Sequence, residues 1–194
     1  SHAIKYLNPF LKKSSKLIDT LYLSPILFPE RPYHNLVKDD KIISDQLNNP
    51  LSDSLKAKQL FEDELERFKG LAENVRRAYY DLLNENGHFK GFFDFAQYSS
   101  SRLSYLFNTK TDNISDILEE VVCSKANISR IVDLSPTELA YAIAIIRTGD
   151  RYSITPAWVQ HQFPLVDNII HKLRGINCGE CKYCREHLDA RKML

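Results

Sequence analysis

The chain has 194 residues, 43% of them hydrophobic, so it is long enough to bury the core of one domain with a smaller second one. The charged residues almost cancel to a net charge of +1, so a contact with nucleic acid must come from a local basic patch. No apolar run approaches the roughly 20 residues of a membrane span, and the N-terminus lacks the layout of a signal peptide. We therefore expect a soluble, cytoplasmic protein with no membrane partner.

The first predicted element in chain order is a buried strand. Residues 17–28 form an apolar run rich in β-forming side chains, and Pro29 and Pro32 close it. A helix is predicted next, because Asn49 offers an N-cap, Pro50 suits the first helical position, and apolar residues then recur at helical spacing. The N-terminal part is therefore expected to contain both strand and helix.

The rest of the chain is predicted to be mostly helical. Helical spacing resumes after Gly70 and continues until Gly87, which is a natural stop. Residues 88–112 are aromatic, Ser-rich and irregular, which predicts a junction between domains. A capping box followed by apolar positions predicts a helix over 135–149, and a further helix is predicted over 164–175.

The most chemically specific segment is the decapeptide from Cys178 to His187. Two-residue gaps separate Cys178, Cys181 and Cys184, so a tight turn can direct the three sulfurs at one ion. Gly179 permits the close backbone approach that such a turn needs. Three thiolates and one imidazole suit tetrahedral Zn²⁺. We predict a structural zinc knuckle with His187 as the fourth ligand.

Other interpretations of the cysteines remain open. All four predicted ligands are close in sequence, so the fourth can come from elsewhere, with His171 and His161 as reserves. A disulfide would leave an odd cysteine, and the chain shows no secretory signal. An iron–sulfur cluster usually takes four cysteines, whereas Cys123 is predicted to be a buried free thiol in an amphipathic helical segment. Unbound reactive thiols are the last alternative.

A basic patch is predicted around the knuckle. Lysines and arginines outnumber acidic residues there, and a basic zinc knuckle can contact phosphate. The alternative is a solvated or domain-packing face. The residues that we assign to nucleic-acid contact are Lys172, Arg174, Lys182 and Arg185.

Several sequence blocks carry a family resemblance. They are IDTLYLSP at 18–25, FPERPYHNLVK at 28–38, NNPLSD at 48–53 and ITPAWVQHQFP at 154–164. The first three resemble the second half of a DnaQ-like 3′–5′ exonuclease domain, which has an RNase H-like fold. The fourth, with the Cys-rich knuckle behind it, is similar to the segment that follows such a domain in a class of bacterial RecQ-family DNA helicases.

The resemblance implies a fold class between α/β and mainly α. Residues 1–86 would be the second half of the exonuclease domain, and residues 87–175 a helical connector. Residues 176–194 would be the zinc knuckle and the start of a linker to an ATP-binding helicase core in the same parent chain. The chain would then be part of an enzyme of DNA repair, recombination or defence that acts on single-stranded DNA or 3′ ends. The alternatives are a non-catalytic, zinc-dependent DNA-binding or scaffolding module, and a redox or Fe–S regulatory domain.

The resemblance also implies a two-metal site for Mg²⁺ or Mn²⁺, held by four carboxylates. The last of them matches Asp53, although an acidic residue in the first turn of a helix is also favourable to the helix dipole. The first two would precede residue 1, Ala3 stands where the third is expected, and Asn48 stands where a general base is often found. We therefore expect this chain alone to lack exonuclease activity. It also lacks a Gly-Lys-Ser/Thr loop, so ATP would bind only to the parent.

Overall fold

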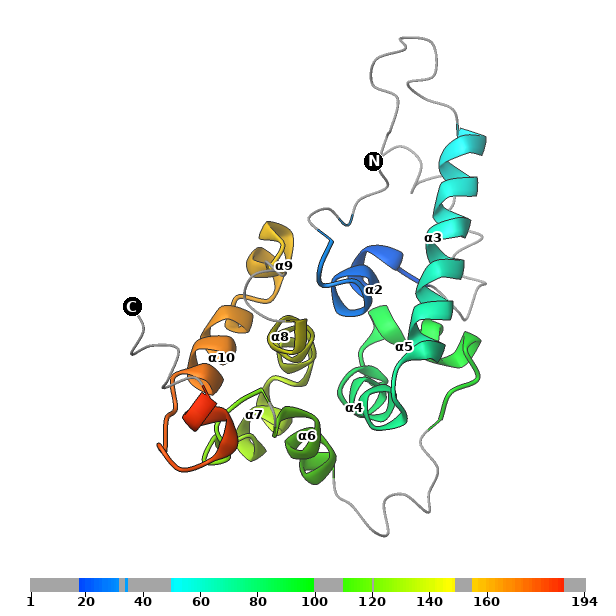
Figure 1. Cartoon of the computed structure of the whole chain (residues 1–194). Coiled ribbons are helices and arrows are strands. Elements are labelled where there is room, and N and C mark those ends of the chain that lie inside the picture. The colour runs from blue at the N-terminus through cyan, green and yellow to red at the C-terminus, as the bar shows by residue number, and fades with distance from the viewer. Residues whose placement is uncertain are drawn as a thin grey trace.

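The computed structural model describes residues 18–31, 34, 50–99, 110–119, 121–148 and 155–186. All regular secondary structure in these residues is helical, with no strand among them (Figure 1). The helices are α2 (Thr20–Leu27), α3 (Pro50–Gly70), α4 (Glu73–Leu83), α5 (Gly87–Phe95), α6 (Lys110–Leu118), α7 (Ser129–Leu134), α8 (Pro136–Thr148), α9 (Ala157–Gln162) and α10 (Leu165–Arg174). A short helical turn follows at 182–186.

The predicted strand over 17–28 is wrong, because most of it forms helix α2. Asp19 caps this helix, and its carboxylate accepts a hydrogen bond of 3.0 Å from the backbone N–H of Leu21. Every residue from Tyr22 to Leu27 is buried. A helix that is covered on all sides has no apolar stripe, so its sequence lacks the helical period that would have identified it.

The predicted irregular junction over 88–112 is also partly wrong. Asn86 caps helix α5 by accepting a hydrogen bond of 3.0 Å from the backbone N–H of His88. Gly87, which the sequence marks as the end of one helix, is therefore also the first residue of the next. The helical environment predicted for Cys123 is wrong too, since this residue lies in the loop between α6 and α7.

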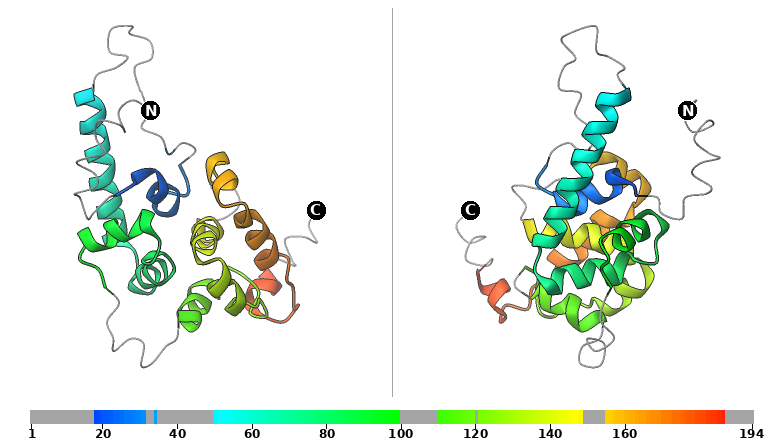
Figure 2. Two further views of the ribbon diagram at one scale, coloured as in Figure 1. Left: turned by 180° about the vertical axis from the view of Figure 1, so that it is seen from behind. Right: turned by 90° about the vertical axis from the view of Figure 1, so that its right-hand side faces the viewer.

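The helices predicted from proline and glycine signals are confirmed as α3, α4, α8 and α10. Helix α8 lies at the centre and contacts α2, α4, α7 and α10 (Figure 2). One hydrophobic core runs from Tyr22 to Leu173, so it includes residues on both sides of the boundary expected at residue 86.

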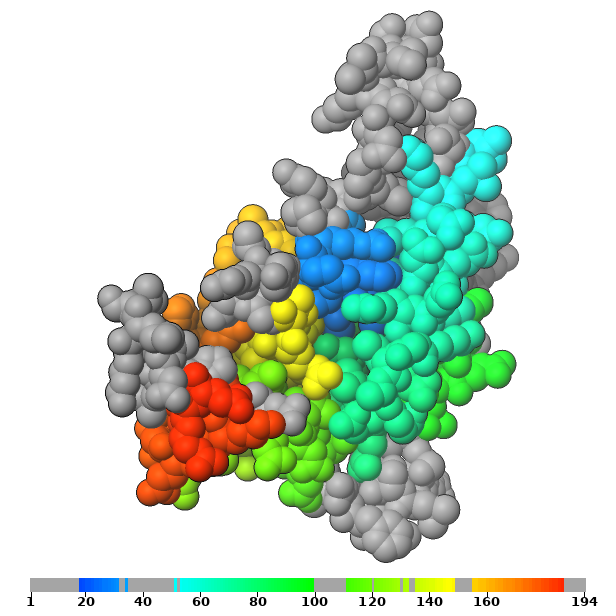
Figure 3. Space-filling model, in the orientation of Figure 1, coloured from blue at the N-terminus to red at the C-terminus, as the bar shows by residue number. Residues whose placement is uncertain are grey.

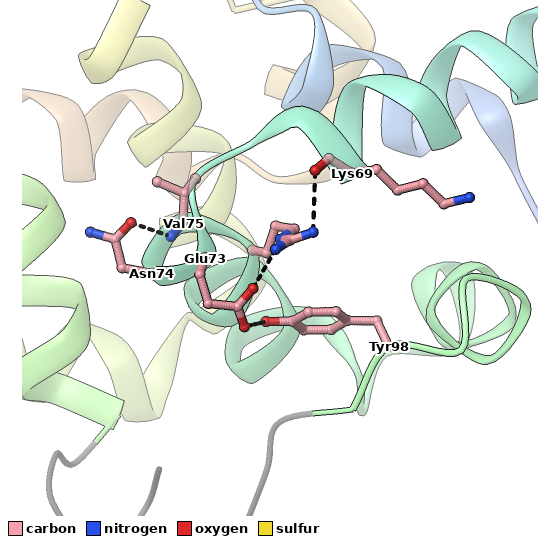
Figure 4. A network of polar contacts seen from close by, with 6 residues as sticks. Lys69, Glu73, Asn74, Val75 and Tyr98 are labelled. Carbon is pink, nitrogen blue, oxygen red and sulfur yellow. Dashed lines mark hydrogen bonds and ion pairs between the residues drawn. The ribbon is translucent and has the colours of Figure 1, made fainter.

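A polar network fixes the segment after α5 against the start of α4 (Figure 4). The Tyr98 hydroxyl donates a hydrogen bond of 2.8 Å to the carboxylate of Glu73, which also forms an ion pair with Arg76. Arg76 in turn donates to the backbone carbonyl of Lys69 over 3.2 Å. Burial, followed by the hydrogen bond to Glu73, raises the pKa of Tyr98, so this hydroxyl remains a donor at neutral pH.

One buried hydrogen bond joins α8 to α2 and gives a first prediction. The Tyr141 hydroxyl donates to the backbone carbonyl of Tyr22 over 2.9 Å. Tyr141→Phe should lower the free energy of unfolding by about 1 kcal/mol, the usual worth of such a bond. Urea denaturation measures this change, and Tyr80→Phe is the control, since no hydrogen bond of the Tyr80 hydroxyl is seen in the described part of the chain. Equal losses in both variants would contradict the assignment.

Candidate metal centre

Four cysteines come together in space. The Sγ atoms of Cys123, Cys178, Cys181 and Cys184 all lie within 4.8 Å of one another, and those of Cys178 and Cys184 are 4.0 Å apart. Among the described residues, this is the one group of three or more potential metal ligands. Cys123 is buried, as predicted, but it does not stand apart from the knuckle, because its sulfur is the fourth of the cluster.

The four sulfurs come from two segments that are far apart in the sequence. Cys123 follows α6, whereas Cys178 and Cys181 lie in the turn after α10 and Cys184 lies in the helical turn at 182–186. Gly179 adopts the left-handed conformation with φ 74°, which favours glycine and lets the chain reverse after the first ligand. The last described segment thus lies beside the loop between α6 and α7 (Figures 1 and 2).

Backbone N–H groups point at the sulfurs. The N–H of Cys181 donates to Cys178 Sγ, that of Cys184 to Cys181 Sγ, and that of Lys125 to Cys123 Sγ, each over 3.4 Å. Hydrogen bonds of this kind favour the thiolate over the thiol, and the thiolate is the form that binds a metal ion. The backbone of both segments is therefore arranged to hold negative charge on sulfur.

The surroundings of the thiols lower the pKa of Cys178 and Cys181 but raise the pKa of Cys184. The backbone N–H of Ser124, followed by that of Cys184, lowers the pKa of Cys181 to about 6. The backbone N–H of Cys181 likewise lowers the pKa of Cys178, whereas burial raises the pKa of Cys184 to about 11. The Cys184 thiol therefore keeps its proton at neutral pH in the absence of a metal ion, so metal binding should release protons.

The histidines predicted as fourth ligands do not belong to the cluster. His161 in α9 and His171 in α10 are exposed, and neither lies with the four sulfurs. His187 lies outside the described residues, so its predicted role is untested. The sequence did contain one signal for the true fourth sulfur, because Cys123 is the single cysteine that the knuckle leaves over.

The predicted basic patch has members on both sides of the turn. Lys172 is exposed on α10 and Arg174 is half-buried at its end, while Lys182 and Arg185 are exposed on the helical turn. Burial lowers the pKa of Arg174 and the nearby Tyr183 opposes this effect. The knuckle that carries Lys182 and Arg185 lies at the surface (Figure 3).

The predicted nuclease residue Asp53 lies in the first turn of α3 and is half-buried. It is not part of a metal-ligand group in the described part of the chain. Ala3 and Asn48, which bear on the same prediction, lie outside the described residues. The catalytic origin of Asp53 therefore stays a prediction.

Comparisons with models of protein families, with curated protein sequences and with solved structures find no match for this chain. The family resemblance thus rests on the sequence blocks and the knuckle alone. In the described part of the chain, no helix is both long enough and apolar enough to cross a membrane.

Proposed function

We propose that the four cysteines hold one structural Zn²⁺ ion. The observation that carries this proposal is the mutual distance of at most 4.8 Å among the four Sγ atoms. Four thiolates at a Zn–S distance of about 2.3 Å stand roughly 3.8 Å apart in a tetrahedron, close to the 4.0 Å between Cys178 and Cys184. An iron–sulfur cluster is disfavoured because its thiolates bind different iron atoms and so stand further apart.

The ion would act as a clasp between the turn after α10 and the loop after α6. Ile176 and Asn177 at the start of that turn are exposed, and Cys184 is its one fully buried side chain. A segment with so little core of its own gains its order from the metal, so metal binding and local folding are one event. The clasp also closes a long loop that contains α7 to α10, which restricts the unfolded chain.

We further propose, from the resemblance, that this chain is a connector within a DNA helicase that carries a 3′–5′ exonuclease. Asp53 would be one of the carboxylates for Mg²⁺ or Mn²⁺, and the ATP-driven helicase core would belong to the same parent chain. The order of the sequence blocks and the knuckle behind them support this proposal. The clasp would then hold a basic surface of fixed shape against single-stranded DNA or a 3′ end.

One observation favours the second candidate, a non-catalytic zinc-dependent DNA-binding or scaffolding module. The described residues contain no strand and no cluster of carboxylates, so no part of a nuclease active site is assembled in them. Such a module would still bind DNA through its basic residues. Restoring the upstream carboxylates in a longer chain and assaying Mg²⁺-dependent degradation of single-stranded DNA separates the two candidates.

The DNA contact gives a second prediction. The double variant Lys182→Ala and Arg185→Ala should weaken binding to a single-stranded oligonucleotide about equally for all sequences. It should also reduce the slope of log affinity against log salt by about 1 to 2, since each lost phosphate contact removes somewhat less than one unit. The effect is limited because the thiolates and Zn²⁺ sum to a net negative charge that these cations also neutralise. Fluorescence anisotropy at several salt concentrations measures both quantities.

The matched control for this variant is Lys69→Ala, which removes an exposed lysine at the end of α3. Its affinity and salt slope should equal those of the unmodified chain. If the double variant behaves like the control, the surface around the knuckle does not contact DNA, and its charges only neutralise the metal centre.

A further inference from the structure

An open surface cavity of about 570 Å³ lies beside the first residues of α2 and α5. Its lining residues are Ile18, Asp19, Thr20, Asn86, Gly87 and His88, none of which belongs to the metal centre. This volume falls within the roughly 300–1,000 Å³ of small-molecule sites in proteins.

The imidazole ring of His88 lines this cavity and is fixed by stacking. The imidazole of His88 stacks on the ring of Tyr22, with centroids 4.0 Å apart and an interplanar angle of 6°. Tyr22 is itself buried, and the ring of Trp158 contacts it edge-on at 5.3 Å. Tyr22 covers one face of His88, and no other ring stacks on this imidazole in the described part of the chain, so its second face and its edge are left for a ligand.

The polar groups of the cavity select the ligand further. Asn86 is already occupied, since it accepts from the N–H of His88 and donates to Thr137. One oxygen of Asp19 accepts from Leu21, and no ion pair of Asp19 is seen among the described residues. A carboxylate accepts N–H donors and repels negative charge, and stacking on His88 suits a flat group. The ligand group should therefore be flat, carry N–H donors and bear no negative charge.

We propose that this cavity binds a nucleobase that bears an exocyclic amino group. The base would stack on the free face of His88 and donate its amino hydrogens to Asp19, as cytosine does to carboxylates in DNA complexes. This inference rests on the proposed function for the source of the base, which is single-stranded DNA. The guanidinium of an arginine from a partner protein is also flat and carries N–H donors. It is smaller than the cavity, however, and the proposed function supplies nucleobases from single-stranded DNA.

The probe for this site is deoxycytidine, with thymidine as the matched ligand that lacks the amino group. Fluorescence of Trp158, the single tryptophan, reports binding, because its ring contacts the Tyr22 ring that supports His88. We expect deoxycytidine to bind more tightly than thymidine. His88→Ala should weaken deoxycytidine binding about tenfold, since base stacking is worth about 1–3 kcal/mol, while His88→Phe should retain the affinity.

Two further variants keep the fold while changing the site. Asp19→Asn preserves the helix cap, because asparagine is an equally good N-cap, yet it should remove the preference for deoxycytidine over thymidine. A side chain added at Gly87 meets no atom within 4 Å of its Cβ, so Gly87→Leu should fold normally and block the cavity. Unchanged circular dichroism and a lost fluorescence response are the expected results.

Equal binding of the two nucleosides, unchanged binding in Gly87→Leu, or tighter binding of N-acetylarginine amide would overturn the proposal. These outcomes are independent of the metal centre, which is assayed by zinc content in the same preparation. A zinc-free chain that still prefers deoxycytidine would refute the proposed clasp and retain the base site. A zinc-loaded chain that binds neither nucleoside would refute the base site and retain the proposed clasp.

Discussion

Replacing Cys123 by serine should release the metal ion, although the three cysteines of the knuckle remain unchanged. The loss follows from the geometry, since Cys123 Sγ lies within 4.8 Å of the other three sulfurs. Losing even an outer partner of a metal ligand lowers affinity by about 10–100-fold, so the loss of a ligand should exceed about 100-fold. Competition with a chromogenic chelator measures the affinity.

The matched control is Ser124→Ala. Ser124 interacts with Cys181 through its backbone N–H, which the substitution preserves, so the variant should hold its metal like the unmodified chain. If Cys123→Ser retains full affinity, the fourth ligand is another residue, and His187 would be the first to examine. If both variants lose the metal, the loop is sensitive to any change and the ligand assignment is unsupported.

Release of the ion should disorder both segments of the clasp. In the knuckle the disorder should cover roughly residues 176–190 and leave the preceding helices folded. Because Cys123 supplies a sulfur, residues 121–128 should lose protection from hydrogen exchange as well. The core of α8 should stay protected, since residues 139–144 are all buried in contacts that do not involve the metal.

Replacing Glu64 by methionine should stabilise the protein at neutral pH. Glu64 in α3 is fully buried, and neither of its carboxylate oxygens has a hydrogen-bond partner among the residues that the structure describes. Burial raises the pKa of Glu64 from 4.5 to about 9, with Arg31 opposing the shift and Asp19 and Asp63 adding to it. Methionine has a similar shape and no polar atom to satisfy, so the variant should gain about 1–3 kcal/mol at pH 7.

The sign of the pH effect follows from the raised pKa. The unfolded chain loses the Glu64 proton at about 4.5, whereas the folded chain keeps it up to about 9, so folding takes up a proton between these values. The contribution of Glu64 is most favourable below pH 4.5, and stability is lost as pH rises toward 9. The advantage of Glu64→Met should therefore grow with pH across this window, which urea denaturation at pH 5, 7 and 9 measures.

A second buried group, His34, also makes the stability of the protein depend on pH. The quantity to compare is therefore the difference in the free energy of unfolding between the Glu64→Met variant and the unmodified chain. Burial lowers the pKa of His34 from 6.5 to about 4, and Ser24 Oγ is 2.9 Å from its Nδ1. Its contribution is present above pH 6.5 and is lost as pH falls toward 4, opposite to that of Glu64. Subtraction cancels this contribution, which both proteins share.

The control for Glu64→Met is Glu66→Met, at an exposed position of the same helix. It should leave stability almost unchanged at every pH. A destabilised Glu64→Met variant, or an advantage that does not change with pH, would show that the Glu64 carboxyl is charged or paired in the folded protein.

Local signals in the sequence predicted the parts of the fold that local interactions determine. Asn49-Pro50 marks the start of α3, and the apolar spacing over 135–149 marks α8. These features depend on caps, periodicity and hydrophobicity within a few residues.

The parts that were missed depend on tertiary packing. Helix α2 is buried on all sides, so neither its period nor its β-forming residues identify it. Cys123 becomes a ligand only because the fold brings the loop after α6 to the turn after α10. No spacing rule relates a ligand to a knuckle so far away in sequence. The sequence pointed beyond the decapeptide only through the closeness of its four predicted ligands and the one cysteine left over.

The central claim is a single zinc ion held by four sulfurs, and X-ray absorption at the zinc edge of the purified chain tests it most directly. The arrangement of Cys123, Cys178, Cys181 and Cys184 predicts one zinc per chain with four sulfur neighbours at about 2.3 Å and no nitrogen neighbour. Three sulfurs with one nitrogen would mean that a histidine replaces Cys123. A reduced, folded chain that contains iron or no metal would contradict the account.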